Sequence, residues 1–297
     1  MSIRAQRILQ IIVYLGIFST ICSVLFFMFG APDVAMAEAS VSSFSTIFLI
    51  ICFEKYFSLV IYTTDDPPAG KRLVAWIKNN LLPIGFTVAL LALFIYFIPD
   101  SPVSTYVKDK YLEGFMRDVG GENTVTAIYL GYRMYDTLFE ALMLLVSVVG
   151  VAHMSVYGDS EVTDKQISGV SKTDKVAVYT IRIICPTMLL FGVYLTLNGH
   201  LTPGGGFQGG VAVASFLICR YLIHNIADVR FNRVIVMEKL VYAAIIVLAA
   251  YFILLLVYVR LPGMRDIYLM MMNTLIAMKV ACGFAIIFYR YIAFERR

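Results

Sequence analysis

The sequence predicts an all-α, polytopic membrane protein with about eight transmembrane helices and both termini in the cytoplasm. Of its 297 residues, 60% are hydrophobic and only 15% are charged, whereas soluble domains carry about 25% charged residues. The apolar residues are gathered into stretches of about 20, the length that crosses a bilayer as a helix. Lys and Arg are distributed unevenly between alternate connecting segments, and this asymmetry predicts the orientation.

The first apolar stretch is followed by Asp33 and Glu38 rather than by a small-residue cleavage site, so we expect it to be retained as a helix. The predicted spans in chain order are 8–29, 34–53, 81–98, 134–155, 176–197, 207–227, 234–258 and 267–292. With the N-terminus inside, 16 Lys and Arg residues fall on cytoplasmic segments and 6 on external ones. This excess favours cytoplasmic termini in the cell membrane.

Two cytoplasmic loops divide the predicted spans into blocks. The loops are a Thr, Asp, Pro and Gly cluster at 63–70 and a segment at 157–175 rich in Gly, Ser, Asp and Lys. The predicted blocks are 1–62 with two helices, 72–156 with two and 174–297 with four. We expect the external segment 99–125 to be an ordered loop, and its apolar residues leave open that it lies on the outer membrane face or against a partner.

The run from Asn198 to Gly210 interrupts this series of apolar helices. Non-helical backbone at membrane depth must be buried in protein or line a wet cavity, because lipid cannot hydrogen-bond it. Such breaks mark places where polar species bind or pass. No Gly-Lys-Ser/Thr follows the glycines, so the run is not a phosphate-binding loop; we expect its glycines to permit close packing. The residues expected to support ion movement are His200, Pro203, Gly204, Gly205, Gly206, Phe207 and Gln208.

Ionisable groups inside apolar spans are costly and are therefore candidate functional groups. Asp33 follows Pro32 at the start of the second span, where a carboxylate suits the positive end of a helix. Glu38 lies more than one turn further in and needs a partner, a proton or a cation. We interpret Glu38 as a group for ion or proton transfer, with a structural ion pair as the alternative.

Arg133, Asp136 and Glu140 open the fourth span at spacings that place them on one helix face. Arg133 can neutralise Asp136 near the external surface, while Glu140 lies one turn deeper. A carboxyl group there can exchange a proton for a cation, the minimum chemistry of an antiporter; the alternative is a surface salt bridge plus one structural acid. We hypothesise that Glu38, Glu140 and the glycine run line or stabilise one external access path for ions.

Lys279 lies near the middle of the last span and cannot easily reach water. It is either part of a proton relay, because a buried lysine changes its protonation state readily, or half of a structural pair with a carboxylate on another helix or subunit. The five cysteines lie in predicted helices and form no CxxC pair, so we expect small apolar residues. Without a haem-type ligand pair or a nucleotide loop, we expect no redox site of its own, no bound cofactor and no nucleic-acid partner.

The Pro-Gly-Gly-Gly-Phe-Gln-Gly-Gly core of the glycine run, with residues 182–192 before it, resembles the MrpB (MnhB) subunit of multisubunit Na+/H+ antiporters. Asn273 and Lys279 also resemble the closing helix of that family. The first block, with Gly30 to Ala35 and Glu38, is similar to the first small domain that ends the large MrpA subunit. The second block is similar to the second such domain through Asn123, Arg133, Asp136-Thr137-Leu138 and Glu140.

Two departures accompany the resemblance. The first domain of the family usually has a further helix before the one that starts near Ile8, and it is missing here. In the second domain, Asp, Gly, Phe and Gly of the family pattern are replaced by Gly131, Met134, Tyr135 and Phe139. The bulkier helix surface puts its close packing against a partner helix in doubt.

The resemblance implies that Glu38 and Glu140 take part in moving the transported ions, Na+ and H+. It implies other Mrp-type membrane subunits as partners, including small helical subunits and a large antiporter-like subunit. Because the tail-like blocks are separate from that large subunit, the arrangement resembles respiratory complexes of the membrane-bound hydrogenase or sulfane-sulfur reductase type, with a peripheral redox arm. The alternatives are a subunit of a stand-alone Mrp antiporter and a purely structural membrane scaffold.

Overall fold

The structure is a computed structural model that describes residues 5–57, 69–97, 105–156, 175–223, 231–258 and 262–293. The described part is helical nearly throughout and contains no strand. Its helices are α1 (Ala5–Met28), α2 (Pro32–Phe57), α3 (Ala69–Tyr96), α4 (Tyr106–Asp118), α5 (Thr124–Ala127), the π-helix η2 (Ile128–Tyr132), α6 (Met134–Val156), α7 (Lys175–Asn198), α8 (Gly206–Ile223), α9 (Phe231–Tyr258) and α10 (Pro262–Ala293).

The predicted all-α, multi-pass fold is confirmed. Within the described residues, 6 helices are long and apolar enough to cross a membrane, namely α1, α2, α6, α7, α9 and α10. α3 and α8 contribute the shorter apolar segments Ile84–Tyr96 and Gly206–Arg220. Each of the predicted spans therefore coincides with an apolar helix. The side of the membrane on which the termini lie stays a prediction, as does the division into blocks.

The centre of the fold is the packing of α8 between α7 and α10, and it depends on glycine. A Cβ atom added at Gly209 would lie 2.1 Å from the Thr196 hydroxyl of α7, and one added at Gly210 would lie 2.7 Å from the Ala277 carbonyl of α10. Any side chain at these positions would push the helices apart, because van der Waals contact needs more than 3 Å. The glycine run thus permits the close packing expected of it.

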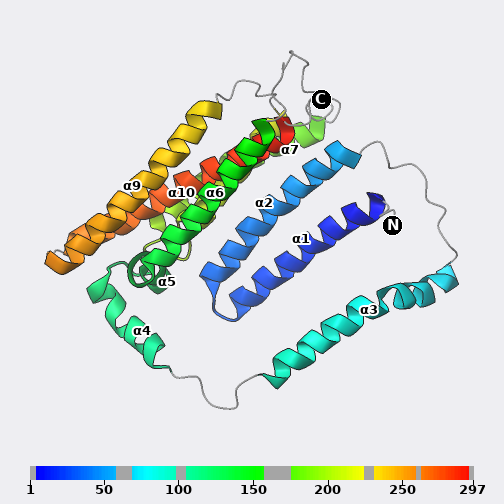
Figure 1. Cartoon of the computed structure of the whole chain (residues 1–297), viewed down its shortest axis with the longest axis horizontal. Coiled ribbons are helices and arrows are strands. Elements are labelled where there is room, and N and C mark those ends of the chain that lie inside the picture. The colour runs from blue at the N-terminus through cyan, green and yellow to red at the C-terminus, as the bar shows by residue number, and fades with distance from the viewer. Residues whose placement is uncertain are drawn as a thin grey trace.

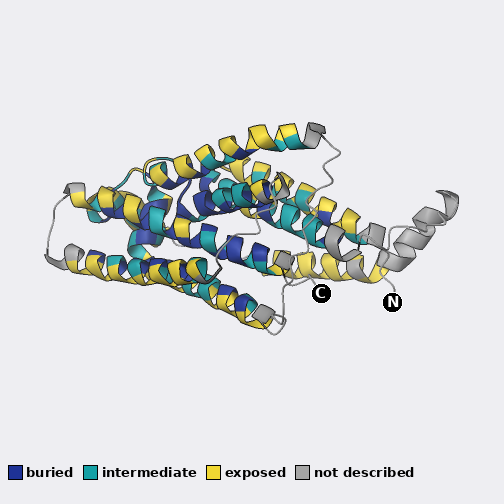
Figure 2. Ribbon diagram, turned by 90° about the horizontal axis from the view of Figure 1, so that it is seen from above, coloured by how far each residue is buried: buried dark blue, intermediate teal, exposed yellow. Residues whose placement is uncertain are grey.

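The α1–α2 hairpin lies along one side of this centre, with α2 between α1 and the rest of the bundle (Figure 1). The Phe44 ring of α2 lies 4.5 Å from the Phe284 ring of α10, centroid to centroid. α3 stands apart from the bundle in the same view, and each of its residues with a described side chain is exposed (Figure 2). A helix with such an apolar surface is stable only against lipid or another membrane subunit.

The segment 99–125 is helical over most of its described part, whereas the sequence predicts an ordered loop. α4 carries alternating charged and apolar residues, so it has no apolar run that would mark it as a span. It is attached through its Tyr111 ring, which stacks 4.6 Å from the ring of Tyr132, and through Asp118, which accepts a hydrogen bond of 3.0 Å from the Tyr132 hydroxyl. The sequence therefore missed a short amphipathic helix at the end of the bundle.

Candidate functional site

Asp33 joins all of the predicted blocks at one end of the bundle. It lies at the start of α2, as expected, but its side chain is only 7% exposed and makes long-range contacts. Its Oδ1 atom accepts hydrogen bonds of 3.0 Å from the side-chain amide of Asn123 and 3.0 Å from the backbone N–H of Gly204. A carboxylate oxygen that accepts from two donors fixes the positions of both partners. Asp33 is thus a joint between helices as well as a helix-end group.

Asn123 is the centre of this joint. Its Oδ1 atom caps α5 by accepting hydrogen bonds from two backbone N–H groups, those of Val125 and Thr126. Its Nδ2 atom also lies 3.1 Å from the Gly199 carbonyl and 3.0 Å from the Thr202 carbonyl. Protein groups therefore satisfy the hydrogen bonds of the bent backbone of residues 198–210, here called the glycine segment, as non-helical backbone in a membrane requires.

The backbone of His200 supports the same joint, and Pro203 lies close to it in the chain. The His200 carbonyl accepts hydrogen bonds of 2.9 Å from the Glu122 N–H and 3.0 Å from the Asn123 N–H. The Nδ1 atom of its ring is buried and has no hydrogen-bond partner among the described residues. Pro203 lies in the turn between α7 and α8, where no helix continues. The described contacts of His200 thus come through its backbone rather than through its imidazole.

A second hydrogen-bonded link, centred on Asn273, connects η2, α8 and α10. The fully buried Asn273 accepts hydrogen bonds at Oδ1 from the Tyr129 hydroxyl, at 3.0 Å, and from the Gly206 N–H, at 3.1 Å. A Cβ atom at Gly205 would lie 2.3 Å from that Tyr129 hydroxyl. Gln208 is buried beside Gly205. These contacts explain why a side chain is excluded at this point of the glycine segment.

Arg133 and Asp136 form the ion pair that their spacing predicts. The Arg133 Nε atom donates to Asp136 Oδ2 at 2.6 Å, and both side chains are more than half exposed. An exposed pair is screened and contributes about 0–1 kcal/mol. The two residues therefore neutralise each other at the start of α6 and leave Glu140 without either as a partner.

Glu140 and Lys279 line one small cavity in the middle of the bundle. Its volume is about 30 Å³, which exceeds the roughly 10–15 Å³ that a cavity needs to hold a water molecule. Glu140 is otherwise exposed at the side of α6. The residues that line the cavity are Thr137, Glu140, Ala141 and Leu144 of α6, Phe207 of α8, and Ile276, Lys279 and Val280 of α10. Phe207 is thus the residue of the glycine segment that lines the cavity with the charged groups.

Lys279 is paired with a carboxylate that sequence reasoning did not single out. Its Nζ atom donates a hydrogen bond to Glu238 Oε1 of α9, and the side chains are 1% and 0% exposed. The same ammonium lies 5.0 Å from the centre of the Tyr242 ring. The second Glu238 oxygen, Oε2, is buried without a partner among the described residues. Removing one member of such a pair would leave an uncompensated buried charge.

A signal for Glu238 was present in the sequence. Within the predicted spans of the third block, Glu238 is the only carboxylate, so it was the only acid of that block able to meet Lys279 inside the membrane. Glu238 is next to Lys239 near the start of its predicted span, and two adjacent charges there are also typical of the end of a helix at the membrane surface. The structural-pair alternative for Lys279 is confirmed as a contact, while its role as a proton relay stays a prediction.

Glu38 lies elsewhere, in the α1–α2 hairpin. Its Oε1 atom accepts a hydrogen bond from the Ser19 hydroxyl of α1, and its side chain is half-buried. Glu38 does not line the cavity that Glu140 and Lys279 share. The structure therefore brings Glu140, Lys279 and Phe207 together, and it brings Asp33 to the glycine segment; a common path that includes Glu38 stays a prediction.

The fold and these contacts define a multi-pass helical membrane protein with ionisable groups buried between its spans. Residues 176–294 match the family described as a domain related to the MnhB subunit of Na+/H+ antiporter. Residues 1–57 match the MbhD family, the D-type subunit of MBH. The two matched regions follow one another in the chain order that the resemblance implies, with the region similar to MbhD before the region similar to MnhB.

Curated relatives include components of antiporters. The A/B-type component of a probable K(+)/H(+) antiporter of Rhizobium meliloti is 24% identical, over 71% of this chain and 23% of that protein. The A1 component of a Na(+)/H(+) antiporter of Staphylococcus haemolyticus is 30% identical, over 60% of this chain and 20% of that protein. The chain thus spans about a fifth of the length of these relatives.

Two solved structures share the fold. A chain in the structure of the Mrp complex from Dietzia sp. DQ12-45-1b has a TM-score of 0.67 at 17% identity, covering 99% of this chain and 34% of that one. A chain of the membrane-bound sulfane sulfur reductase, an archaeal respiratory membrane complex, has a TM-score of 0.51 at 26% identity. That match covers 73% of this chain and 96% of the other.

Proposed function

We propose that this chain is an ion-translocating membrane subunit of an Mrp-type cation/proton antiporter module. One observation carries the proposal: Glu140 and Lys279 line a cavity large enough to hold water, and Lys279 is hydrogen-bonded to the fully buried Glu238. Three ionisable side chains on α6, α10 and α9 are thus connected across the interior of the bundle. Such groups in a membrane are costly and are retained where charge must pass.

Glu140 is the proposed exchange group. A proton and a monovalent cation such as Na+ both neutralise its carboxylate and compete for the same oxygens, so binding of one releases the other. One side of Glu140 lies on the exposed face of α6, where a partner subunit of the module would complete the access path for ions, and its other side reaches the cavity. The antiport of Na+ and H+ requires no more chemistry than this competition.

Lys279 is the proposed control of that exchange. When its ammonium is directed across the cavity towards an ionised Glu140, it opposes the binding of a cation there. When Lys279 is held by Glu238, the charge of Glu140 must be neutralised by a bound proton or a bound cation instead. The lysine stem is flexible enough for both positions, and Glu238 keeps one oxygen without a partner in the described part of the chain. Protonation of Glu140 and the position of Lys279 are thereby coupled.

Asp33, Asn123 and Asn273 have a positioning role in this proposal. They fix the glycine segment and thereby the depth of Phe207, which lines the cavity. Glu38, half-buried beside Ser19, is proposed as a second acid on the access path. With the orientation expected from the positive charges, the access path opens on the external side.

The proposed setting is a redox-driven respiratory complex. The match to a chain of the sulfane sulfur reductase complex over 96% of that chain supports it. Electrons are then handled by a peripheral redox arm, and this chain binds no cofactor and has no redox site of its own. Its partners are other Mrp-type membrane subunits, both small helical ones and a large antiporter-like one, for which the exposed faces of α3 and α6 provide apolar surface.

The competing function is a structural scaffold, favoured by the buried Glu238–Lys279 pair, which also serves as a fixed link between α9 and α10. Na+-driven pH changes in inverted vesicles separate the two functions. The variants are Glu140→Gln, Glu38→Gln and Lys279→Met in the assembled complex, and Glu113→Gln on the exposed surface of α4 is the matched control. Loss of antiport in Glu140→Gln with normal assembly supports translocation. Normal antiport in all variants supports the scaffold.

A further inference from the structure

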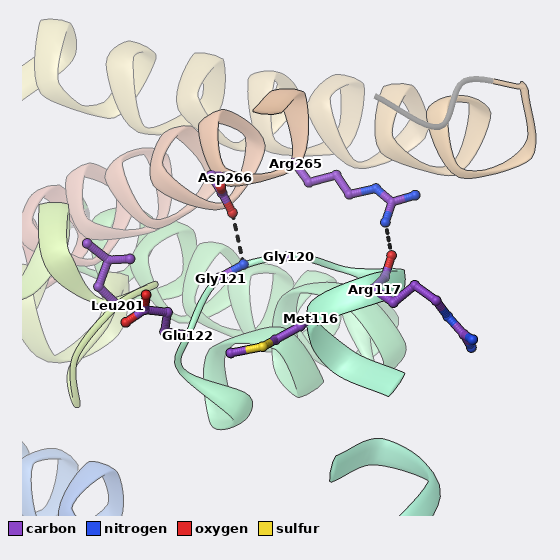
Figure 3. Close-up of a pocket in the computed structure, with 8 residues that line it drawn as sticks. All are labelled: Met116, Arg117, Gly120, Gly121, Glu122, Leu201, Arg265 and Asp266. Atoms are coloured by element: carbon purple, nitrogen blue, oxygen red, sulfur yellow. Dashed lines mark hydrogen bonds between the residues drawn. The ribbon is translucent and has the colours of Figure 1, made fainter. Parts of the chain in front are cut away.

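A larger cavity lies at the same end of the bundle as the glycine segment, and the proposed ion path does not use it. Its volume is about 550 Å³ and it opens to the surface, which is within the usual range of small-molecule sites, about 300–1,000 Å³. Its walls come from the end of α4, the loop before α5, the glycine segment at Leu201 and the first turn of α10 (Figure 3).

Backbone forms the floor of this cavity. Gly120 and Gly121 have φ angles of 92° and 77°, in the left-handed region that favours glycine. The Gly121 N–H donates a hydrogen bond of 2.9 Å to Asp266 Oδ1 of α10. A Cβ atom at Gly120 would lie 2.9 Å from the same oxygen. The loop is therefore held directly on α10, and the cavity is a built feature rather than a gap between loose segments.

The charges in the cavity are separated into two ends. At one end, Arg265 donates from Nη1 to the Arg117 carbonyl, while its Nε atom is buried without a partner among the described residues. The Arg117 guanidinium beside it is 86% exposed and pairs with the neighbouring Asp118. The two carboxylates lie away from the guanidinium groups: Glu122 is beside Leu201, and Asp266 lies over Gly121 (Figure 3).

The rim of the cavity is apolar. Met116 and Leu201 line it, and both are exposed, as is the neighbouring Leu112 of α4. α4 is an amphipathic helix at the end of the membrane-spanning bundle, the place where such helices contact the boundary between headgroups and acyl chains. A ligand of this cavity thus meets two cationic groups, two carboxylates and an apolar edge at the depth of lipid headgroups.

We propose that this cavity binds the headgroup of an aminophospholipid. Arginine suits the phosphate because its planar guanidinium donates two parallel hydrogen bonds, so the phosphate lies at the Arg117 and Arg265 end. The primary ammonium lies between Glu122 and Asp266, and the acyl chains leave over Leu112, Met116 and Leu201. Two arginines and two carboxylates line the cavity, and Asp118 already pairs with Arg117, so the site has no net positive charge and favours a zwitterion over an anionic lipid.

The test measures lipid binding by the delipidated full-length chain, within its complex where it requires one, by native mass spectrometry. Phosphatidylethanolamine, phosphatidylcholine and phosphatidylglycerol with identical acyl chains are compared. We expect phosphatidylethanolamine to bind at least about fivefold more tightly than either, because the ammonium of choline has no N–H donor and glycerol has no charge. Arg117→Gln and Glu122→Gln, both at the surface and therefore tolerated by the fold, should each reduce this affinity about tenfold.

Lys108→Gln is the matched control, because it removes an exposed positive charge from α4 outside the cavity. Equal binding of the three lipids, or an equal loss in Lys108→Gln and Arg117→Gln, would overturn the proposal. Soluble glycerophosphoethanolamine distinguishes the source of the ligand. If it competes as well as the lipid does, the cavity binds a soluble zwitterion and the lipid assignment is wrong. None of these readouts depends on ion transport.

Discussion

The Glu238–Lys279 pair provides the sharpest prediction about stability. Both side chains are essentially inaccessible, at 0% and 1% exposed. Removing one member of a buried pair typically costs about 3–5 kcal/mol, because the remaining charge has no partner. Replacing both with uncharged side chains of similar volume is often neutral. We therefore expect Glu238→Gln and Lys279→Met each to lower the free energy of unfolding by about 3 kcal/mol or more, and the double variant to lower it by less than either.

The assay is equilibrium unfolding in sodium dodecyl sulfate of the purified chain and its three variants, analysed as a double-mutant cycle. The expected coupling energy is at least about 3 kcal/mol, since two large losses would be replaced by one small loss. The exposed pair Arg133–Asp136 serves as the internal comparison and should give a coupling of about 0–1 kcal/mol. Additive effects at Glu238 and Lys279 would refute the reasoning that the two charges neutralise each other.

Three further predictions concern packing, the joint and pH. Gly209→Ala should destabilise the chain by about 1–3 kcal/mol through its contact with Thr196, whereas Gly85→Ala, with nothing within 4 Å, should not, as thermal unfolding of both can show. Asp33→Asn should cost about 1.5–3 kcal/mol in the same measurement, against less than about 1 kcal/mol for the exposed Asp136→Asn; equal losses would contradict the joint. Burial raises the pKa of Asp118, but hydrogen bonds from Arg117 and Tyr132 outweigh it and hold that pKa below its usual value. The ionised Asp118 therefore stabilises the attachment of α4 fully above its unfolded pKa of about 4, and this stabilisation is lost as pH falls through the lower folded pKa. Tyr132→Phe removes one of the two hydrogen bonds, so α4 should detach at a higher pH than in the wild type. Hydrogen exchange of the α4 amides measures this.

Features set by local periodicity could be predicted from the sequence. The apolar stretches specify their helices because each is long enough to cross a bilayer by itself. The Arg133–Asp136 contact follows from helical spacing alone. The close packing of α8 follows from glycines that no other residue can replace there.

Features that depend on which helices meet could not be predicted in the same way. Asn123 is one polar residue in a loop, and its importance appears only when Asp33 and the glycine segment lie beside it. Glu238 pairs with a residue 41 positions away in the chain. α4 has the composition of a surface segment, so hydropathy does not reveal it. The partners of a polar group in a helical bundle depend on tertiary contacts, and these cannot be predicted from the spacing of residues along one helix.

The most direct test of the central claim is Na+-driven proton movement in inverted vesicles that contain the assembled complex with Glu140→Gln. Glutamine keeps the size of the side chain, so the cavity with Lys279 is preserved while the exchangeable proton is lost. The account predicts that antiport falls at least about tenfold, while Glu113→Gln leaves it unchanged. Wild-type antiport in a fully assembled Glu140→Gln complex would contradict the claim that this chain moves the ion.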